Sequence, residues 1–118
     1  MGTQESILVP AALDRLVGRA VEAIDRLDLG GRRLAVMGEN TADILVAHLG
    51  ALTAGVSSVP VARYLGAAEV AYILADSGAG ALLASGRTAE VAAKAAAQAG
   101  VPHLPLEDWL AEDRKSVV

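Results

Sequence analysis

Cysteine is absent from the sequence, and aromatic residues make up only 3% of its 118 residues. The absence of cysteine excludes disulfides, thiolate nucleophiles and cysteine-based zinc sites. The two histidines, His48 and His103, are too far apart in the chain to form a metal-binding pair on one helix. Because 53% of the residues are apolar, the core must be built from closely packed aliphatic side chains rather than from aromatic anchors.

Positive charge is also scarce, because 10 lysines and arginines stand against 14 aspartates and glutamates, a formal net charge of −4. This balance disfavours non-specific binding to nucleic acid. No stretch approaches the roughly 20 consecutive apolar residues that cross a bilayer, and the N-terminus lacks the basic start of a secretory signal. We therefore expect one small cytoplasmic domain with no membrane span and no nucleic-acid partner.

The first patterned segment predicts an amphipathic helix over residues 13–27. Its leucines, valines, alanines and isoleucine recur at the 3.6-residue period of a helix, and charged residues occupy the opposite side. Pro10 lies near the expected start of this helix, where proline is tolerated, and Gly30 and Gly31 follow its end.

After this helix, short apolar runs alternate with helical segments. Strands are expected at residues 34–37, 56–61, 80–84 and 101–104, and helices at residues 42–52, 66–76, 88–99 and 106–111. This alternation predicts right-handed βαβ crossovers and a parallel sheet with helices on both faces. We expect an α/β fold in which residues 1–111 form a single subdomain of about four short parallel strands with crossover helices. Residues 112–118 have no periodicity and are expected to be a disordered tail.

The turns after the strands are the usual ligand-binding positions of a parallel α/β domain, and none of them carries a known catalytic motif. The turn at residues 37–41 has one glycine, whereas a dinucleotide fingerprint needs three. No phosphate loop of the G-x-x-x-x-G-K-[ST] kind precedes Lys94 or Lys115, and no serine lies in G-x-S-x-G. Glu39 stands without the neighbouring acids that a receiver domain needs at its strand ends.

Five residues are candidates for a site, and each has a simpler structural interpretation. His48 lies on an apolar helix face, where a packed histidine with satisfied ring nitrogens is favoured. Arg63 and Tyr64 follow the second strand, where a ligand could arrive, but a surface loop is favoured. Glu69 occupies the position of a capping-box acid, and Trp109, the only tryptophan, is better explained by docking of a terminal helix than by stacking on a ligand.

Several segments, in chain order, resemble motifs of the adenylate-forming ligase superfamily. Residues 13–27 are similar to its opening helix, and residues 31–36, Gly-Arg-Arg-Leu-Ala-Val, resemble its G-d-R-V-A-V strand. Asn40 stands where the family has a strand-to-helix asparagine. Residues 52–60, Leu-Thr-Ala-Gly-Val-Ser-Ser-Val-Pro, resemble the L-x-A-G-x-x-x-V-P signature, and residues 71–79, Ala-Tyr-Ile-Leu-Ala-Asp-Ser-Gly-Ala, resemble x-Y-I-L-x-D-S-G-A. The resemblance covers roughly residues 8–111 and is strongest to the acyl-CoA synthetases.

This resemblance implies the N-terminal part of an ATP-dependent acyl-CoA synthetase. Such an enzyme activates a carboxylic acid as an acyl-adenylate and transfers it to coenzyme A, with ATP and Mg²⁺ as its cofactors. In the family the phosphate loop, the ribose-binding carboxylate and the lysine for adenylation all follow the segment present here. The resemblance therefore implies a scaffold that is inactive alone, without catalytic, cofactor-binding or metal-binding residues of its own, and that associates with the remainder of the ligase or with itself.

Two questions stay open at this point. Residues 62–66, Ala-Arg-Tyr-Leu-Gly, depart from the family pattern of Asn or Asp, then Pro or an aromatic residue, then Leu-Thr. This departure leaves the class of carboxylic acid undetermined. The alternative function is that of a non-enzymatic α/β module for protein interaction, derived from the same fold.

Overall fold

Helices and strands alternate in the computed structural model, which describes residues 3–39 and 41–106, with the backbone alone for residues 3–10. The helices are α1 (Thr3–Leu27), α2 (Ala42–Thr53), α3 (Ala67–Ser77), the 3₁₀ turn η1 (Gly86–Thr88) and α4 (Ala89–Ala99). The strands are β1 (Arg33–Met37), β2 (Ser58–Val61), β3 (Ala79–Ala84) and β4 (His103–Pro105).

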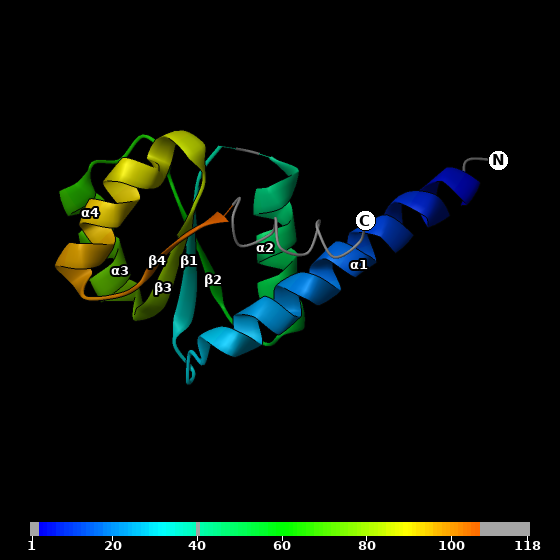
Figure 1. Cartoon of the computed structure of the whole chain (residues 1–118), viewed down its shortest axis with the longest axis horizontal. Coiled ribbons are helices and arrows are strands. Elements are labelled where there is room, and N and C mark those ends of the chain that lie inside the picture. Colours follow the sequence, from blue (N-terminus) through cyan, green and yellow to red (C-terminus); the bar gives the residue numbers. More distant parts are fainter. Residues whose placement is uncertain (1–2, 40, 107–118) are drawn as a thin grey trace.

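The four strands form one parallel sheet in the order β2-β1-β3-β4 (Figure 1). The first strand, β1, lies inside the sheet, and β2 pairs with it at one edge. The chain then crosses back over β1 to form β3 and finally β4 at the other edge. Because parallel crossovers are right-handed, this reversal sends α2 to one face of the sheet and α3 and α4 to the other. Helix α1 packs on α2, and α3 packs on α4, so the fold has three layers. The expected α/β fold with four short parallel strands is confirmed.

The core has two halves, one on each face of the sheet. In β1, Leu34 and Val36 face the α1–α2 layer, whereas Ala35 and Met37 face the α3–α4 layer. All six residues of β3 are buried, as expected of a strand that helices cover on both faces. The largest fully buried side chains are leucine, isoleucine, methionine and valine, so the core of the described residues is aliphatic, as the composition predicts.

Small residues let the helices approach one another closely. Gly50 of α2 lies against Ala20 of α1, and a Cβ added at Gly50 would come within 2.6 Å of the Ala20 Cβ. On the other face, α4 packs with buried alanines: Ala92, Ala95 and Ala96. The alanine-rich sequence of α4 therefore provides both a strong helix former and a thin contact surface.

Glycines end two helices where the sequence predicts. Gly78 and Gly100 cap α3 and α4 with φ of +68° and +73°, a left-handed conformation that glycine adopts at low cost. The expected start of the first helix is wrong, because α1 begins at Thr3 and Pro10 lies inside it. A proline there removes one backbone hydrogen bond, yet the backbone is helical on both sides of it.

Helix α1 is much longer than the sheet is deep. Its 25 residues extend about 37 Å at 1.5 Å per residue, roughly twice the length of a five-residue strand. Its N-terminal half therefore projects beyond the layers (Figure 1). No helix within residues 3–39 and 41–106 is both long and apolar enough to cross a membrane. The helix expected at residues 106–111 and the tail expected at residues 112–118 lie outside the described residues, apart from Leu106.

Candidate functional site at the carboxyl ends of the strands

The strand order reverses between β1 and β3, and this reversal creates a crevice. The loop after β1 leads to α2 on one face, whereas the loop after β3 leads to α4 on the other. In open α/β sheets, ligands bind at such a switch point. The crevice has a volume of about 380 Å³ and is lined by Glu39, Thr41, Asp43, Ser85, Gly86 and Arg87.

The floor of this crevice is held by contacts between the two loops. The backbone N–H of Ser85 donates to the carbonyl oxygen of Met37 over 3.1 Å. The hydroxyl of Thr88 donates to the carbonyl oxygen of Ser85 over 2.6 Å and is itself buried. A Cβ at Gly38 would overlap the Ser85 hydroxyl, so a larger residue at position 38 would displace the Ser85 side chain.

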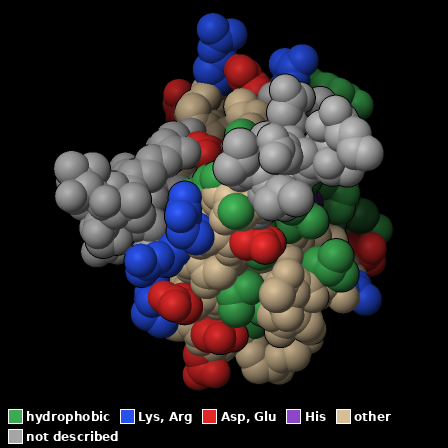
Figure 2. All heavy atoms as spheres, turned by 90° about the vertical axis from the view of Figure 1, so that its right-hand side faces the viewer, with side chains coloured by type: hydrophobic (Ala, Val, Ile, Leu, Met, Phe, Trp, Pro, Cys, Tyr) green, Lys and Arg blue, Asp and Glu red, His purple; other side chains and the backbone are tan. Residues whose placement is uncertain are grey.

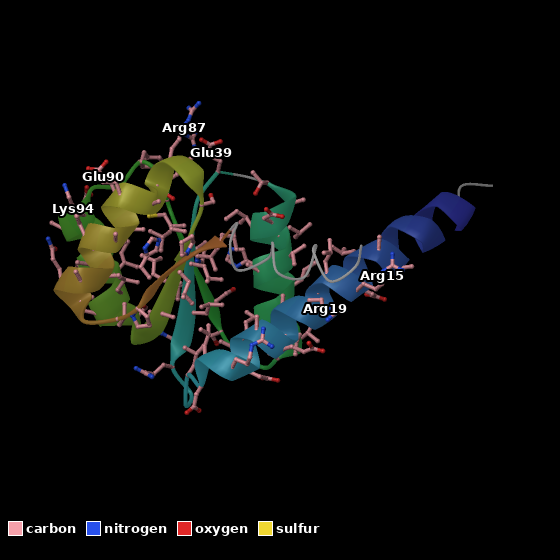
Figure 3. All side chains as sticks on the ribbon, viewed as in Figure 1. Arg15, Arg19, Glu39, Arg87, Glu90 and Lys94 are labelled. Atoms are coloured by element: carbon pink, nitrogen blue, oxygen red, sulfur yellow. The ribbon has the colours of Figure 1, made fainter. Side chains whose placement is uncertain are left out.

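Charged side chains lie at the mouth of the crevice. Arg87 and Glu39 point toward one another from the two loops (Figure 3), with 3.9 Å between the arginine Nε and the carboxylate Oε1. Both side chains are exposed, so this ion pair adds little to stability. Asp43, in the first turn of α2, lines the same crevice. Sequence reasoning missed this grouping, because Asp43 belongs to a helix and Arg87 follows a different strand.

A second depression, the α2–β2 groove, lies between α2 and the end of β2. It is open to solvent and has a volume of about 870 Å³. Its apolar wall comes from Ile44, Leu45, Pro60 and Val61, among others, and its polar side chains are Thr41, His48 and Arg63, with Tyr64 beside them. The chain thus offers a largely apolar groove with a few polar groups, which is the usual composition of a binding surface.

His48 is the polar side chain of this groove that the structure fixes most firmly. Its Nδ1 lies 2.8 Å from the hydroxyl oxygen of Ser58, and partial burial lowers the pKa of the imidazole. The ring is therefore mostly neutral at pH 7, as expected of a packed histidine with a bonded nitrogen. His48 lines the groove and Ser58 does not, so of the two side chains it is the imidazole that a molecule in the groove would contact. The sequence alone did not identify Ser58 as the partner.

The structure does not bring the remaining candidate residues, Arg63, Tyr64 and Glu69, together with His103 in one site. Arg63 and Tyr64 lie at the rim of the α2–β2 groove, where Tyr64 is 83% exposed. Glu69 accepts a hydrogen bond from the backbone N–H of Gly66 over 3.2 Å, which is its expected role at the start of α3. His103 lies on β4 at the other side of the sheet, and burial lowers its pKa too.

Lys94 lies on the surface of the protein and forms an exposed ion pair. It pairs with Glu90 over 3.8 Å on the outer face of α4 (Figure 3), one helical turn away, and neither residue lines a depression described above. Asn40, Trp109 and Lys115 lie outside the described residues. Within the part that the structure describes, no group of three or more His, Asp or Glu side chains could hold a metal ion, and we assign no step of nucleotide chemistry to a described side chain.

Comparisons with known proteins identify the family. The profile of the family described as AMP-binding enzyme matches residues 11–116. The long-chain-fatty-acid–CoA ligase FadD13 of Mycobacterium tuberculosis is 30% identical over 104 residues, which make up 87% of this chain and 20% of that protein. The chain thus spans about a fifth of the length of the curated relatives that it matches.

Solved structures agree with this match. The N-terminal domain of FACL13 from Mycobacterium tuberculosis superposes with a TM-score of 0.79 at 29% identity, covering 90% of this chain and 28% of that one. A benzoate CoA ligase from Burkholderia xenovorans LB400 superposes with a TM-score of 0.74 at 27% identity, covering 84% and 22%. The resemblance inferred from the sequence motifs is therefore confirmed, and the chain belongs to the AMP-binding enzyme family, in which it corresponds to the N-terminal part of an acyl-CoA ligase.

Proposed function

We propose that this chain is the N-terminal structural part of an AMP-forming acyl-CoA ligase. In the proposed reaction, a carboxylate oxygen of the acid attacks the α-phosphorus of ATP, and pyrophosphate leaves. The thiol of coenzyme A then attacks the acyl carbon of the acyl-adenylate, and AMP leaves. The charge that develops on the phosphoryl group has to be met by fixed donors and Mg²⁺, which we place in the rest of the enzyme. The family match and the names of the similar proteins support this proposal.

The observation that supports a structural role for this chain is that the outer face of α2 exposes apolar side chains. Val46, Ala47, Gly50 and Ala51 are buried against the rest of the molecule. On the opposite side, Leu45 and Leu52 are 51% and 75% exposed, and the half-buried Leu49 lies between them. The spacing of these leucines, four and then three residues, makes one continuous stripe on the helix surface. A helix that carries an exposed apolar stripe opposite its buried face is typical of a helix inside a larger body.

Exposed hydrophobic side chains are visible between charged ones in Figure 2, which views the molecule from the side on which α1 projects. We propose that later parts of the ligase cover the α2 leucine stripe. The buried core of this chain then holds the sheet, and the sheet presents the crevice and the α2–β2 groove toward that partner. In this proposal ATP, Mg²⁺ and coenzyme A are bound by the complete enzyme.

A chimera tests the proposal. In it, the matched N-terminal part of FadD13 is replaced by this chain, in one polypeptide, and pyrophosphate release is measured with ATP and a fatty acid. We expect the chimera to release pyrophosphate and the 118-residue chain alone to release none. Turnover by the 118-residue chain alone would contradict the structural role. A chimera that is folded and monodisperse, yet inactive beside active FadD13, would favour the non-enzymatic interaction module instead.

A pair of variants tests the leucine stripe within the same chimera. Leu52→Ser removes the most exposed leucine of α2, and Tyr72→Ser is the matched control, because Tyr72 is 70% exposed on α3 in the opposite layer. Full burial of a leucine is worth about 1.5–3 kcal/mol, so Leu52→Ser should lower the stability of the chimera by about that amount. In the isolated chain, the same substitution should change stability by less than about 0.5 kcal/mol. Equal effects in both contexts would show that nothing covers the stripe.

A further inference from the structure

The α2–β2 groove and the α2 leucine stripe form one continuous surface. Leu45 belongs to both, because it lines the groove and is also an exposed leucine of the stripe. Tyr64, at the far side of the groove, is the most exposed large hydrophobic side chain among the described residues. A continuous exposed apolar surface of this kind is typical of an interaction site. A partner that covers the stripe is therefore well placed to enter the groove.

Strand β2 is the edge of the sheet that borders the groove, and its backbone disfavours the addition of a further strand. Leu34 pairs with Ser58 in the register of β1 and β2, and the Leu34 N–H donates to the carbonyl oxygen of Ser57 over 3.0 Å. In a parallel ladder, this register turns the backbone groups of Ser58 and Pro60 toward the open edge. Pro60 has no N–H to donate, and proline on an edge strand is a common barrier to strand pairing.

A helix fits this edge better than a strand. It needs no hydrogen bonds from β2, because its backbone groups are satisfied internally. The leucines of the stripe recur at helical spacing, and such a ridge of side chains packs into the surface groove of a facing helix. The chain spans about a fifth of the length of FadD13, so the later part of the proposed ligase is long enough to supply the helix.

Arg63 gives the groove a positive charge. Its side chain is exposed and forms none of the ion pairs among the described residues. None of the described residues that line the groove is an aspartate or a glutamate. A carboxylate on a molecule in the groove would therefore find a cation without a competing partner. Exclusion of water by that molecule would strengthen the attraction, because the local dielectric falls.

We propose that the α2–β2 groove takes an amphipathic helix from the later part of the ligase. Its apolar side chains lie against Leu45 and Tyr64, and one of its aspartates or glutamates pairs with Arg63. This inference rests on the proposed function, because that function supplies the later part. A strand paired with β2, a second copy of the chain and an uncovered groove are the alternatives that the experiment separates.

Cross-linking identifies the occupant. In the chimera with FadD13, the photoreactive residue p-benzoylphenylalanine replaces Tyr64, and the same replacement at Tyr72, on α3, is the control. We expect position 64 to cross-link, within one polypeptide, to a FadD13 segment that contains an acid and apolar residues spaced three or four apart. Position 72 should not give that product. A segment of alternating apolar and polar residues, a product between two copies, or no product from position 64 would each overturn the proposal.

Charge reversal tests the ion pair. Arg63→Glu should lower the urea midpoint of the chimera and reduce the position-64 cross-link several-fold, but leave the midpoint of the isolated chain unchanged. Arg63→Lys should retain most of both properties. Lys94→Glu, on the outer face of α4, is the control and should affect the chimera and the isolated chain equally. Replacement of the acid in the cross-linked segment by lysine should restore the midpoint of Arg63→Glu. Equal effects of Arg63→Glu in both proteins would overturn the ion pair.

The outcomes distinguish this inference from the proposed function. An active chimera that gives no cross-link from position 64 would leave the ligase function standing and overturn the groove helix. A folded chimera that releases no pyrophosphate but cross-links from position 64 to a helical segment with an acid would do the reverse. A chimera that does not fold would contradict both, because both require the later part of a ligase to fit this chain.

Discussion

Gly38, at the end of β1, lies so close to Ser85, after β3, that a side chain at position 38 would overlap the serine hydroxyl. The neighbouring backbone hydrogen bond from Ser85 to Met37 measures 3.1 Å. The two loops of the switch point are therefore in direct contact before they diverge to opposite faces of the sheet.

Replacement of Gly38 tests how closely the two loops are packed. In Gly38→Ala the new methyl group would meet Ser85 and also the Ile44 side chain at 3.0 Å, and overpacking of this kind costs about 1–3 kcal/mol. We expect the urea midpoint to fall accordingly. Gly18→Ala is the control, because no atom lies within 4 Å of a Cβ there and alanine favours a helix interior by about 0.5–1 kcal/mol. A Gly38→Ala variant as stable as the parent chain would show that the loops can separate freely.

The contact between α1 and α2 depends on Gly50 in a similar way. Gly50→Ala would bring two methyl groups within 2.6 Å at Ala20, and we expect a loss of about 1–3 kcal/mol in the free energy of unfolding. Ala20→Gly removes one of those methyl groups, so the double variant should be more stable than Gly50→Ala alone. The two effects must be coupled if the residues touch. Strictly additive effects in urea denaturation would contradict the close packing.

Much of this fold follows from local pattern. The near-continuous apolar runs in β1 and β3 and the glycines after α3 and α4 predict the elements, because buried parallel strands and helix C-termini require those residues. The start of α1 was misplaced, because proline is usually found in the first turn of a helix and here Pro10 lies further in. The strand order could not be derived from local pattern, since it depends on which face each crossover covers.

The candidate site was less accessible from sequence than the fold. Glu39 and Arg87 are 48 residues apart in numbering and meet only because β1 and β3 are neighbours in the sheet. The bond between His48 and Ser58 likewise joins a helix to an edge strand. Such pairs depend on register, whereas a local motif such as Glu69 at the start of α3 needs only a spacing of three residues.

Two neighbouring residues after β3 should differ in their effect on stability. The Thr88 hydroxyl is buried and donates to the Ser85 carbonyl over 2.6 Å, so Thr88→Val should cost about 0.5–1.5 kcal/mol. Arg87→Ala breaks the exposed pair with Glu39 and should cost less than about 0.5 kcal/mol. Urea denaturation at two salt concentrations checks both, and only the small Arg87 effect should weaken with salt. The reverse order of costs would mean that the ion pair holds the crevice.

Stability should depend on pH through His48. Burial places its pKa in the folded chain below the ordinary 6.5, so between those two values the unfolded chain binds a proton that the folded chain does not. The contribution of neutral His48 to the free energy of unfolding is therefore completely present above pH 6.5, and it is lost as the pH drops toward the folded-state pKa. Urea denaturation at about pH 7.5 and about pH 5.5 measures this loss, and His48→Gln should reduce it. His103→Gln should reduce it independently, because burial lowers that pKa as well. A loss that stays unchanged in His48→Gln would mean that the imidazole titrates as freely in the folded chain as in the unfolded one.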